Sequence, residues 1–187
     1  MTQLDNILSF NQTFVANEDY KRFTTTKFPE KKIVILTCMD TRLVELLHAS
    51  MNLRNGDAKI IRNAGAVISH PFGSIMRSIL VAIYELGAEE VYVIGHHGCG
   101  MTGLSAPSIL EKAEGRGVDL DQISSLEYAG VDIHQFLSGF DDVKESVRHS
   151  VDTIVHHPLL PSDVRVHGLV IDPETGELEL LVRDLQA

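Results

Sequence analysis

Only two cysteines, Cys38 and Cys99, occur among the 187 residues, which is too few for a disulfide-stabilised scaffold. In a reducing compartment, a pair of cysteines more often binds a metal or takes part in catalysis than forms a disulfide. Taken alone, each thiol is more typical of core packing, because free cysteine is among the most buried residue types. Each cysteine follows an apolar run, and this shared placement favours one common site.

Basic residues are also scarce. The chain has 16 Lys and Arg against 26 Asp and Glu, a formal net charge of −10. Because a phosphate backbone or an anionic membrane surface is repelled by this charge, we expect no nucleic-acid partner and no membrane partner. No apolar run approaches the roughly 18 residues that span a bilayer, and no leader pattern follows Met1. We therefore expect a soluble, cytoplasmic protein.

The remaining composition is typical of a compact α/β protein, with 44% hydrophobic and 22% charged residues. A chain of this length can bury one sizeable core but has little room for a second. The sequence shows no internal repeat, low-complexity tract or linker. We therefore predict a single domain over residues 1–187.

Apolar runs alternate along the chain with segments of helical periodicity. The run at 32–38 is almost unbroken, as expected of a parallel strand that is buried on both faces. A turn signal, Asp172-Pro-Glu-Thr-Gly176, joins the last two runs into a hairpin. The sequence predicts strands at 32–38, 58–62, 91–95, 164–171 and 178–182, and helices at 2–20, 42–49, 72–86, 107–114 and 140–156, with short helices between 120 and 138.

This order of elements predicts an α/β fold. Four strands alternate with helices, which is typical of a doubly wound, mostly parallel sheet flanked by helices. The fifth strand returns through the hairpin, so it should lie antiparallel at an edge of the sheet. The N-terminal helix carries large apolar residues on one face, which either cap the domain or pack on a second subunit.

Residues that can bind a metal follow two of the predicted strands. Cys38 ends the first strand, and His96, His97 and Cys99 follow the strand at 91–95. The carboxyl ends of parallel strands meet at one edge of a doubly wound sheet, where sites form. Two thiolates and one imidazole supply three ligands of a tetrahedral zinc site and leave a fourth position open. From spacing alone, either His96 or His97 can be the third ligand.

Two charged residues lie directly beyond Cys38. Two thiolates cancel the charge of Zn²⁺, so the metal acidifies a bound water less than it would beside three neutral histidines, and a helper is needed. Asp40 is placed to accept a hydrogen bond from that water, while Arg42 holds the carboxylate ionised and oriented. The alternative is that Asp40 caps the helix that starts near Arg42. Beside a cysteine ligand, we favour the catalytic interpretation.

These residues resemble the β-class carbonic anhydrases, most closely the compact prokaryotic ones. The similarity covers most of the chain from residue 32 onward and extends through the helix at 74–87 and the ending at 166–176. The shared motifs are Cys38-Met-Asp40-Thr-Arg42, Arg62-Asn-Ala-Gly65 and His96-His-Gly-Cys99. The chain departs from the family at His97-Gly98, where Ser or Thr followed by Asp is common, and at Thr41, where serine is commoner.

The resemblance implies one Zn²⁺ per chain, held by Cys38, His96 and Cys99. It also implies an Asp40–Arg42 dyad, with carbon dioxide and bicarbonate as substrate and product. The implied assembly is a homodimer or a dimer of dimers, which the first helix helps to join. Some relatives have a regulatory bicarbonate pocket built on tryptophan, and because the chain has no tryptophan we do not expect that pocket here.

The implied mechanism is attack of metal-bound hydroxide on carbon dioxide, after which bicarbonate exchanges with water. The resemblance also suggests a closed state, in which Asp40 occupies the fourth position on the metal and excludes water. The alternative function is that of a non-catalytic zinc-binding paralogue of the same fold, with a regulatory or structural role.

Two further motifs carry less weight. Residues 98–103 match G-x-G-x-x-G after a strand, but the dinucleotide fingerprint belongs on the first strand-helix unit and leaves Cys38 unexplained. The segment from Cys38 to Arg42 is similar to a phosphatase loop, but it is too short to wrap a phosphate in backbone amides.

Overall fold

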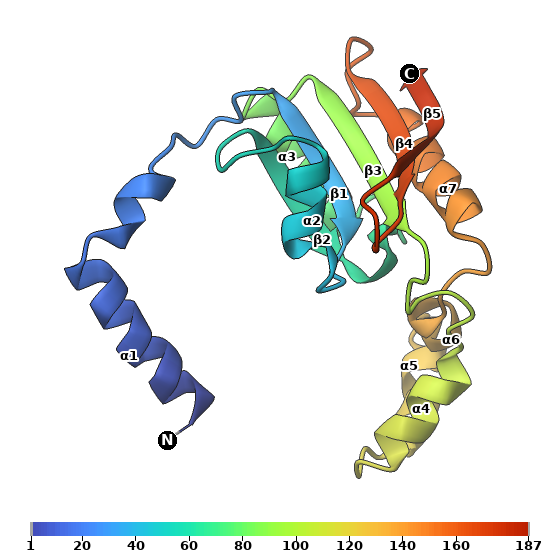
Figure 1. The fold of residues 1–187 in the computed structure, drawn as a ribbon. Helices are drawn as coiled ribbons and strands as arrows, with labels where there is room; N and C mark the ends of the chain where they lie inside the picture. Colours follow the sequence, from blue (N-terminus) through green and yellow to red (C-terminus); the bar gives the residue numbers. More distant parts are fainter. Residues whose placement is uncertain (1, 187) are drawn as a thin grey trace.

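The computed structural model describes residues 2–186, apart from the side chains of Gln122 and Ser124. Its centre is a five-stranded sheet in the order β2-β1-β3-β4-β5 (Figure 1). Pairing is parallel from β2 through β4 and antiparallel between β4 and β5, which confirms the predicted four parallel strands and edge strand. The strands are β1 (Ile33–Cys38), β2 (Ala58–Asn63), β3 (Glu90–His96), β4 (Arg165–Ile171) and β5 (Leu178–Leu185).

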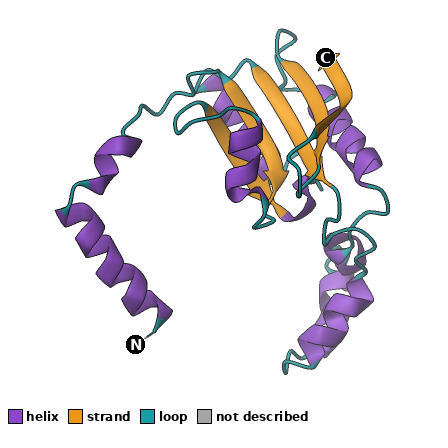
Figure 2. Cartoon of the chain, in the orientation of Figure 1, coloured by secondary structure: helices purple, strands orange, loops and turns teal. Residues whose placement is uncertain are grey.

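Helices cover both faces of this sheet, as expected of a doubly wound fold (Figure 2). One face packs against α2 (Leu43–Ser50), and the other against α3 (Ser74–Tyr84) and α7 (Val143–Val155). A helical lobe extends beyond the carboxyl ends of the strands and consists of α4 (Ala106–Glu114), α5 (Ile123–Tyr128) and α6 (Ile133–Leu137). The N-terminal helix α1 (Gln3–Ala16) projects from the opposite side of the molecule as an arm (Figure 1).

The element boundaries differ from the predicted ones by a few residues, for local reasons. α3 begins at Ser74 because Gly73, its N-cap, is extended. α7 begins at Val143 because the Asp142 side chain accepts the N–H of Glu145 and caps the helix. α1 ends at Ala16 and is followed by a short 3-10 turn at Asp19–Phe23.

Two apolar layers hold the sheet between its helices. Every residue of β1 is buried, as its unbroken apolar run predicts. Val34 and Leu36 face the layer under α3 and α7, while Ile33 and Ile35 face the layer under α2. Burying each such side chain contributes about 1.5–3 kcal/mol, so the two layers fix the position of β1 firmly. In the described part of the chain, no helix has the length and apolar character needed to cross a membrane.

Gly95, near the end of β3, lets α7 approach the sheet closely. A Cβ atom at this position would lie 2.8 Å from Cγ2 of Val143 and 2.8 Å from Cγ2 of Val147. We expect Gly95→Ala to lower the free energy of unfolding by about 1–3 kcal/mol, because α7 must move outward.

Urea unfolding at one fixed protein concentration measures this loss. Gly115→Ala is the matched control, since a Cβ atom there meets neighbours no closer than 3.5 Å. Equal stabilities for the two variants would contradict the packing described for α7.

Candidate metal centre

The parallel strands β1 and β3 bring three predicted ligands together at their carboxyl ends. Thr37 pairs with Ile94, so Cys38 and His96 leave the sheet side by side, and Cys99 follows in the turn after β3. The ligand atoms of Cys38, His96 and Cys99 all lie within 4.8 Å of one another, and all three residues are buried. The two sulfur atoms are 3.9 Å apart and both cysteines are free thiols. This group has the composition and spacing to hold a metal ion.

The imidazole of His96 is oriented for ligation through Nε2. Its Nδ1 lies 2.9 Å from the carbonyl oxygen of His97, which can only accept, so Nδ1 carries the hydrogen. Nε2 then presents a lone pair, and it is buried with no hydrogen-bond partner among the described residues. Such a backbone contact on the second nitrogen is typical of metal-binding histidines.

His97, which spacing alone left as a competitor, lies outside this group. Its side chain is exposed, whereas only 1% of His96 is accessible to solvent. The backbone N–H of His97 donates to the carbonyl of Ile171 at 3.1 Å, which fixes the turn after β3 against the end of β4.

Asp40 and Arg42 form a tight ion pair beside the three ligands. Nε and Nη2 of Arg42 donate to Oδ1 and Oδ2 of Asp40 at 3.0 and 2.8 Å. Nη2 also donates to the carbonyl oxygen of Gly98 at 3.2 Å, so the pair is anchored to the turn that carries Cys99. Oδ2 of Asp40 lies 3.8 Å from Nε2 of His96. An acidic oxygen therefore faces the point where the ligands converge.

The Arg42 guanidinium holds the pKa of Asp40 well below its usual range, so this carboxylate stays ionised. Asp40 also accepts the backbone N–H of Arg42 at 2.9 Å and thereby shapes the turn into α2. Helix α2 itself begins at Leu43 without a side-chain cap. The alternative that Asp40 caps this helix is therefore wrong, and Asp40 instead shapes the turn before it.

The two thiols differ in acidity. Burial raises the pKa of Cys38, but contact with His96 and the N–H of Gly65 outweigh burial and lower it to about 7. Burial raises the pKa of Cys99 to about 11, despite a hydrogen bond from the N–H of Met101. Contact with Cys38 in turn raises the pKa of His96. A metal cation has to displace the remaining protons when it binds.

The comparison with known proteins agrees with this geometry. A family model described as carbonic anhydrase matches residues 33–178. The solved structure of a β-carbonic anhydrase from Trichomonas vaginalis is 33% identical, superimposes with a TM-score of 0.90, and covers 99% of this chain and 100% of that one. The chain belongs to the β-carbonic anhydrase family.

Two further relatives of the chain carry different names. The Bacillus subtilis protein named "Putative carbonic anhydrase YtiB" is 59% identical over 182 residues, which are 97% of each chain. A protein of Acidithiobacillus thiooxidans named carbon disulfide hydrolase is 28% identical over 156 residues, which are 79% of this chain and 76% of that one.

Two contacts with Cys38 were not predicted from the sequence. One comes from β2 and the other from the turn that follows β2. The backbone N–H of Gly65 donates to Sγ of Cys38 at 3.4 Å. Nη1 of Arg62 donates to the carbonyl oxygen of Cys38 at 3.1 Å. The available signal was the Arg62-Asn-Ala-Gly65 motif, which ends the strand predicted at 58–62.

The glycine motif at 98–103 lacks the context of a dinucleotide site. These residues form turns, and the next helix in the described chain, α4, begins only at Ala106. The fingerprint requires glycines that open a helix directly after the first strand.

The acidities of the ligands predict how metal affinity depends on pH. Cys99, whose pKa is about 11, carries a proton at neutral pH and has to release it on ligation. The apparent affinity for Zn²⁺ should therefore rise with pH, by about tenfold per unit for each proton released. Toward lower pH the dependence steepens, because Cys38, whose pKa is about 7, and His96, whose pKa is raised, also have to release protons.

Competition with a chromophoric chelator, corrected for the chelator's own protonation, measures this dependence between about pH 6 and pH 8. An affinity that does not change over that range would contradict ligation by Cys99.

Proposed function

We propose that this chain is a zinc-dependent carbonic anhydrase that interconverts carbon dioxide and bicarbonate in the cytoplasm. The observation that carries the proposal is the convergence of Cys38, His96 and Cys99, with the ionised Asp40 held beside them by Arg42. Membership of the carbonic anhydrase family makes this reaction the first one to test.

The donor set fits zinc. Two thiolates and an imidazole suit this borderline-soft cation, and the buried Nε2 of His96 has no hydrogen-bond partner among the described residues. Cys38, His96 and Cys99 would hold the ion, which when bound supplies the positive charge that acidifies a water molecule. Three protein ligands leave one tetrahedral position for that water.

Asp40 is the residue that we assign to handling the reacting water. Its Oδ2 lies 3.8 Å from Nε2 of His96, where it would accept a hydrogen bond from that water and orient it. Arg42 keeps this oxygen charged and fixed, because it binds both carboxylate oxygens and the Gly98 carbonyl. The apolar side chains of Met101 and Phe140 pack on the cluster that contains the two cysteines, and they suit an apolar substrate.

Stopped-flow hydration of carbon dioxide by purified protein of known zinc content tests the proposal. We expect the wild-type protein to hydrate carbon dioxide much faster than buffer alone does. Cys38→Ala should lose both zinc and activity, whereas Asp40→Asn should retain zinc. Because Asp40→Asn removes the charge but preserves the shape, we expect its kcat/KM to fall about 100-fold. Asp152→Asn is the matched control, since Asp152 is exposed on α7.

The possible outcomes separate the alternatives. A protein with one zinc per chain and no hydration activity would favour the non-catalytic zinc-binding paralogue. Because one relative is named carbon disulfide hydrolase, release of sulfide from carbon disulfide is measured in parallel. Activity on carbon disulfide alone would show that carbon dioxide is not the substrate, but it would not contradict the proposed metal centre.

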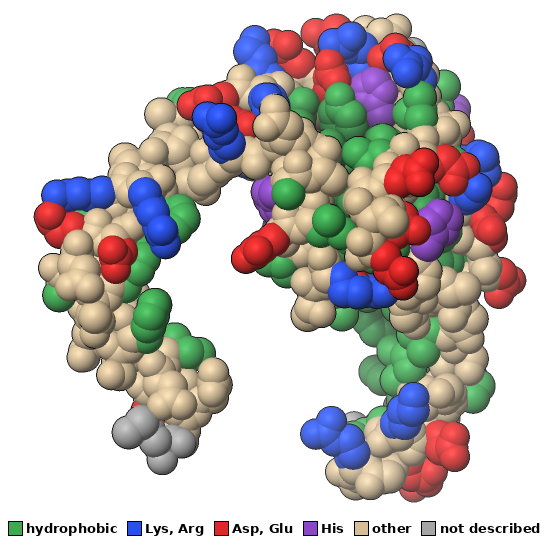
Figure 3. All heavy atoms as spheres, in the orientation of Figure 1, with side chains coloured by type: hydrophobic (Ala, Val, Ile, Leu, Met, Phe, Trp, Pro, Cys, Tyr) green, Lys and Arg blue, Asp and Glu red, His purple; other side chains and the backbone are tan. Residues whose placement is uncertain are grey.

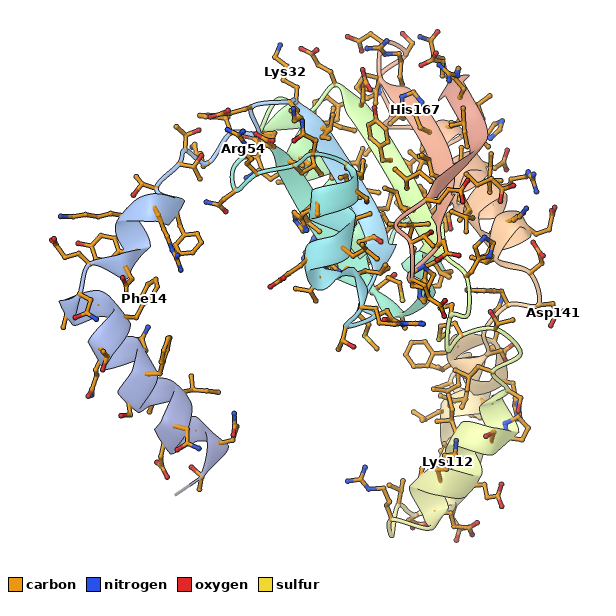
Figure 4. All side chains as sticks on the ribbon, viewed as in Figure 1. Phe14, Lys32, Arg54, Lys112, Asp141 and His167 are labelled. Atoms are coloured by element: carbon orange, nitrogen blue, oxygen red, sulfur yellow. The ribbon has the colours of Figure 1, made fainter. Side chains whose placement is uncertain are left out.

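The arm α1 supports a homodimer, or a dimer of dimers, as the assembly. None of its described residues is buried, although it presents large apolar side chains (Figure 3). Phe14, labelled in Figure 4, lies on this arm away from the sheet. More than half of the surface of Leu4, Ile7, Leu8 and Phe10 is exposed. An amphipathic helix that its own chain leaves uncovered is suited to pack on a second copy.

We expect Ile7→Glu to weaken the dimer at least about tenfold, because a charge then has to enter an apolar interface. Sedimentation velocity over a concentration series measures the change. Ser9→Glu adds the same charge to α1 at a position outside the apolar spacing and should leave the dimer intact. A wild-type protein that stays monomeric at all concentrations would contradict the assembly.

A further inference from the structure

A single segment, residues 62–68, contacts Cys38 at two points. The N–H of Gly65 donates to its sulfur at 3.4 Å, and Nη1 of Arg62 donates to its carbonyl oxygen at 3.1 Å. Nη2 of Arg62 also donates to the carbonyl of Leu43 at 3.1 Å, so the guanidinium spans the stretch that contains Asp40. The segment therefore contacts both the side chain and the main chain of one proposed ligand.

The backbone of this segment adopts an unusual conformation. Gly65 has a φ of +83° and Ala66 a φ of +58°, two successive residues in the left-handed region. For a residue other than glycine this conformation costs about 1 kcal/mol or more, so it persists only where neighbours enforce it. A Cβ atom at position 65 would lie 2.9 Å from Phe140 and 3.1 Å from Met101, so the site leaves no room for a side chain.

Two side chains enforce the conformation. Asn63 brackets the turn, because its Nδ2 donates to the carbonyl of Val67 at 2.7 Å and its Oδ1 accepts the N–H of Val67 at 3.2 Å. Ser150, on α7, is completely buried. Its hydroxyl accepts the N–H of Ile68 at 3.3 Å and donates to the carbonyl of Ala66 at 3.5 Å. The turn is thus held by Asn63, which belongs to the same segment, and by Ser150 on α7, which is distant in the sequence.

We propose that Asn63 and Ser150 are positioning residues of the metal centre, which hold residues 64–68 so that the N–H of Gly65 points at the sulfur of Cys38. The inference rests on the proposed function, in that Cys38 must bind the metal. An N–H donated to a ligating sulfur steadies its orientation and withdraws charge from it. Partners of this kind typically contribute 10–100-fold to metal affinity or activity.

Ser150→Ala in the full-length protein tests the inference, with Co²⁺ as the probe because its sulfur-to-metal absorption band reports the environment of the thiolates. We expect that band to shift and the affinity for Co²⁺ to fall about tenfold, since the turn loses its hold from α7. Asn63→Asp preserves the acceptor for Val67 but removes the donor, and it should shift the same band. Ser146→Ala, one turn earlier on α7, is the matched control and should change neither quantity.

A purely structural role for Ser150 would lower the melting temperature and leave the band and the affinity unchanged, which would overturn the inference. If Ser150→Ala does not fold, Asn63→Asp alone decides between the two roles by the same readouts. Neither readout depends on carbon dioxide hydration, so an inactive wild type with an intact band refutes the proposed function alone. A wild type that binds Co²⁺ without a sulfur band refutes both proposals.

Discussion

The parallel pairing of β1 with β3 is the constraint on which the candidate metal centre depends. The register sets Thr37 opposite Ile94, so the strand that ends in Cys38 and the strand that ends in His96 leave the sheet at the same edge. Both strands are buried between two apolar layers, which makes a slip of register costly. Hydrophobic packing thus brings these three residues together.

A second layer of contacts surrounds the three residues and comes from several elements near the carboxyl edge. Arg42 connects the loop after β1 to the turn after β3 through the Gly98 carbonyl. Arg62 and Gly65 connect β2 to Cys38, and Ser150 connects α7 to the same turn. A centre supported from several elements keeps its geometry when one of them moves, which suits chemistry that depends on distances of a few ångströms.

Much of this arrangement could be predicted from the sequence. The unbroken run at 32–38, the alternation of strands and helices, and the hairpin at Asp172–Gly176 each follow from local patterns, and the sheet confirms them. The rule that parallel strands share one carboxyl edge predicted that Cys38, Cys99 and one of the two histidines after the strand at 91–95 meet. These features depend on periodicity and order along the chain, which the sequence states directly.

Other features could not be predicted, because they depend on three-dimensional contacts between distant residues. The hydrogen bond between Ile68 and Ser150 joins positions 82 residues apart, and no local pattern indicates it. Residue spacing did not decide between His96 and His97, because the choice depends on which imidazole the end of β3 turns inward; the family resemblance implied His96. The left-handed backbone at Ala66 is held by tertiary contacts against the intrinsic preference of alanine, so no propensity predicts it.

X-ray absorption at the zinc edge of the metal-loaded protein tests the central claim most directly, because it counts the ligands by element. Ligation by Cys38, His96 and Cys99 predicts two sulfur atoms and the scattering signature of one imidazole. Fewer than two sulfur atoms, or a second imidazole contributed by a residue such as His97, would contradict it.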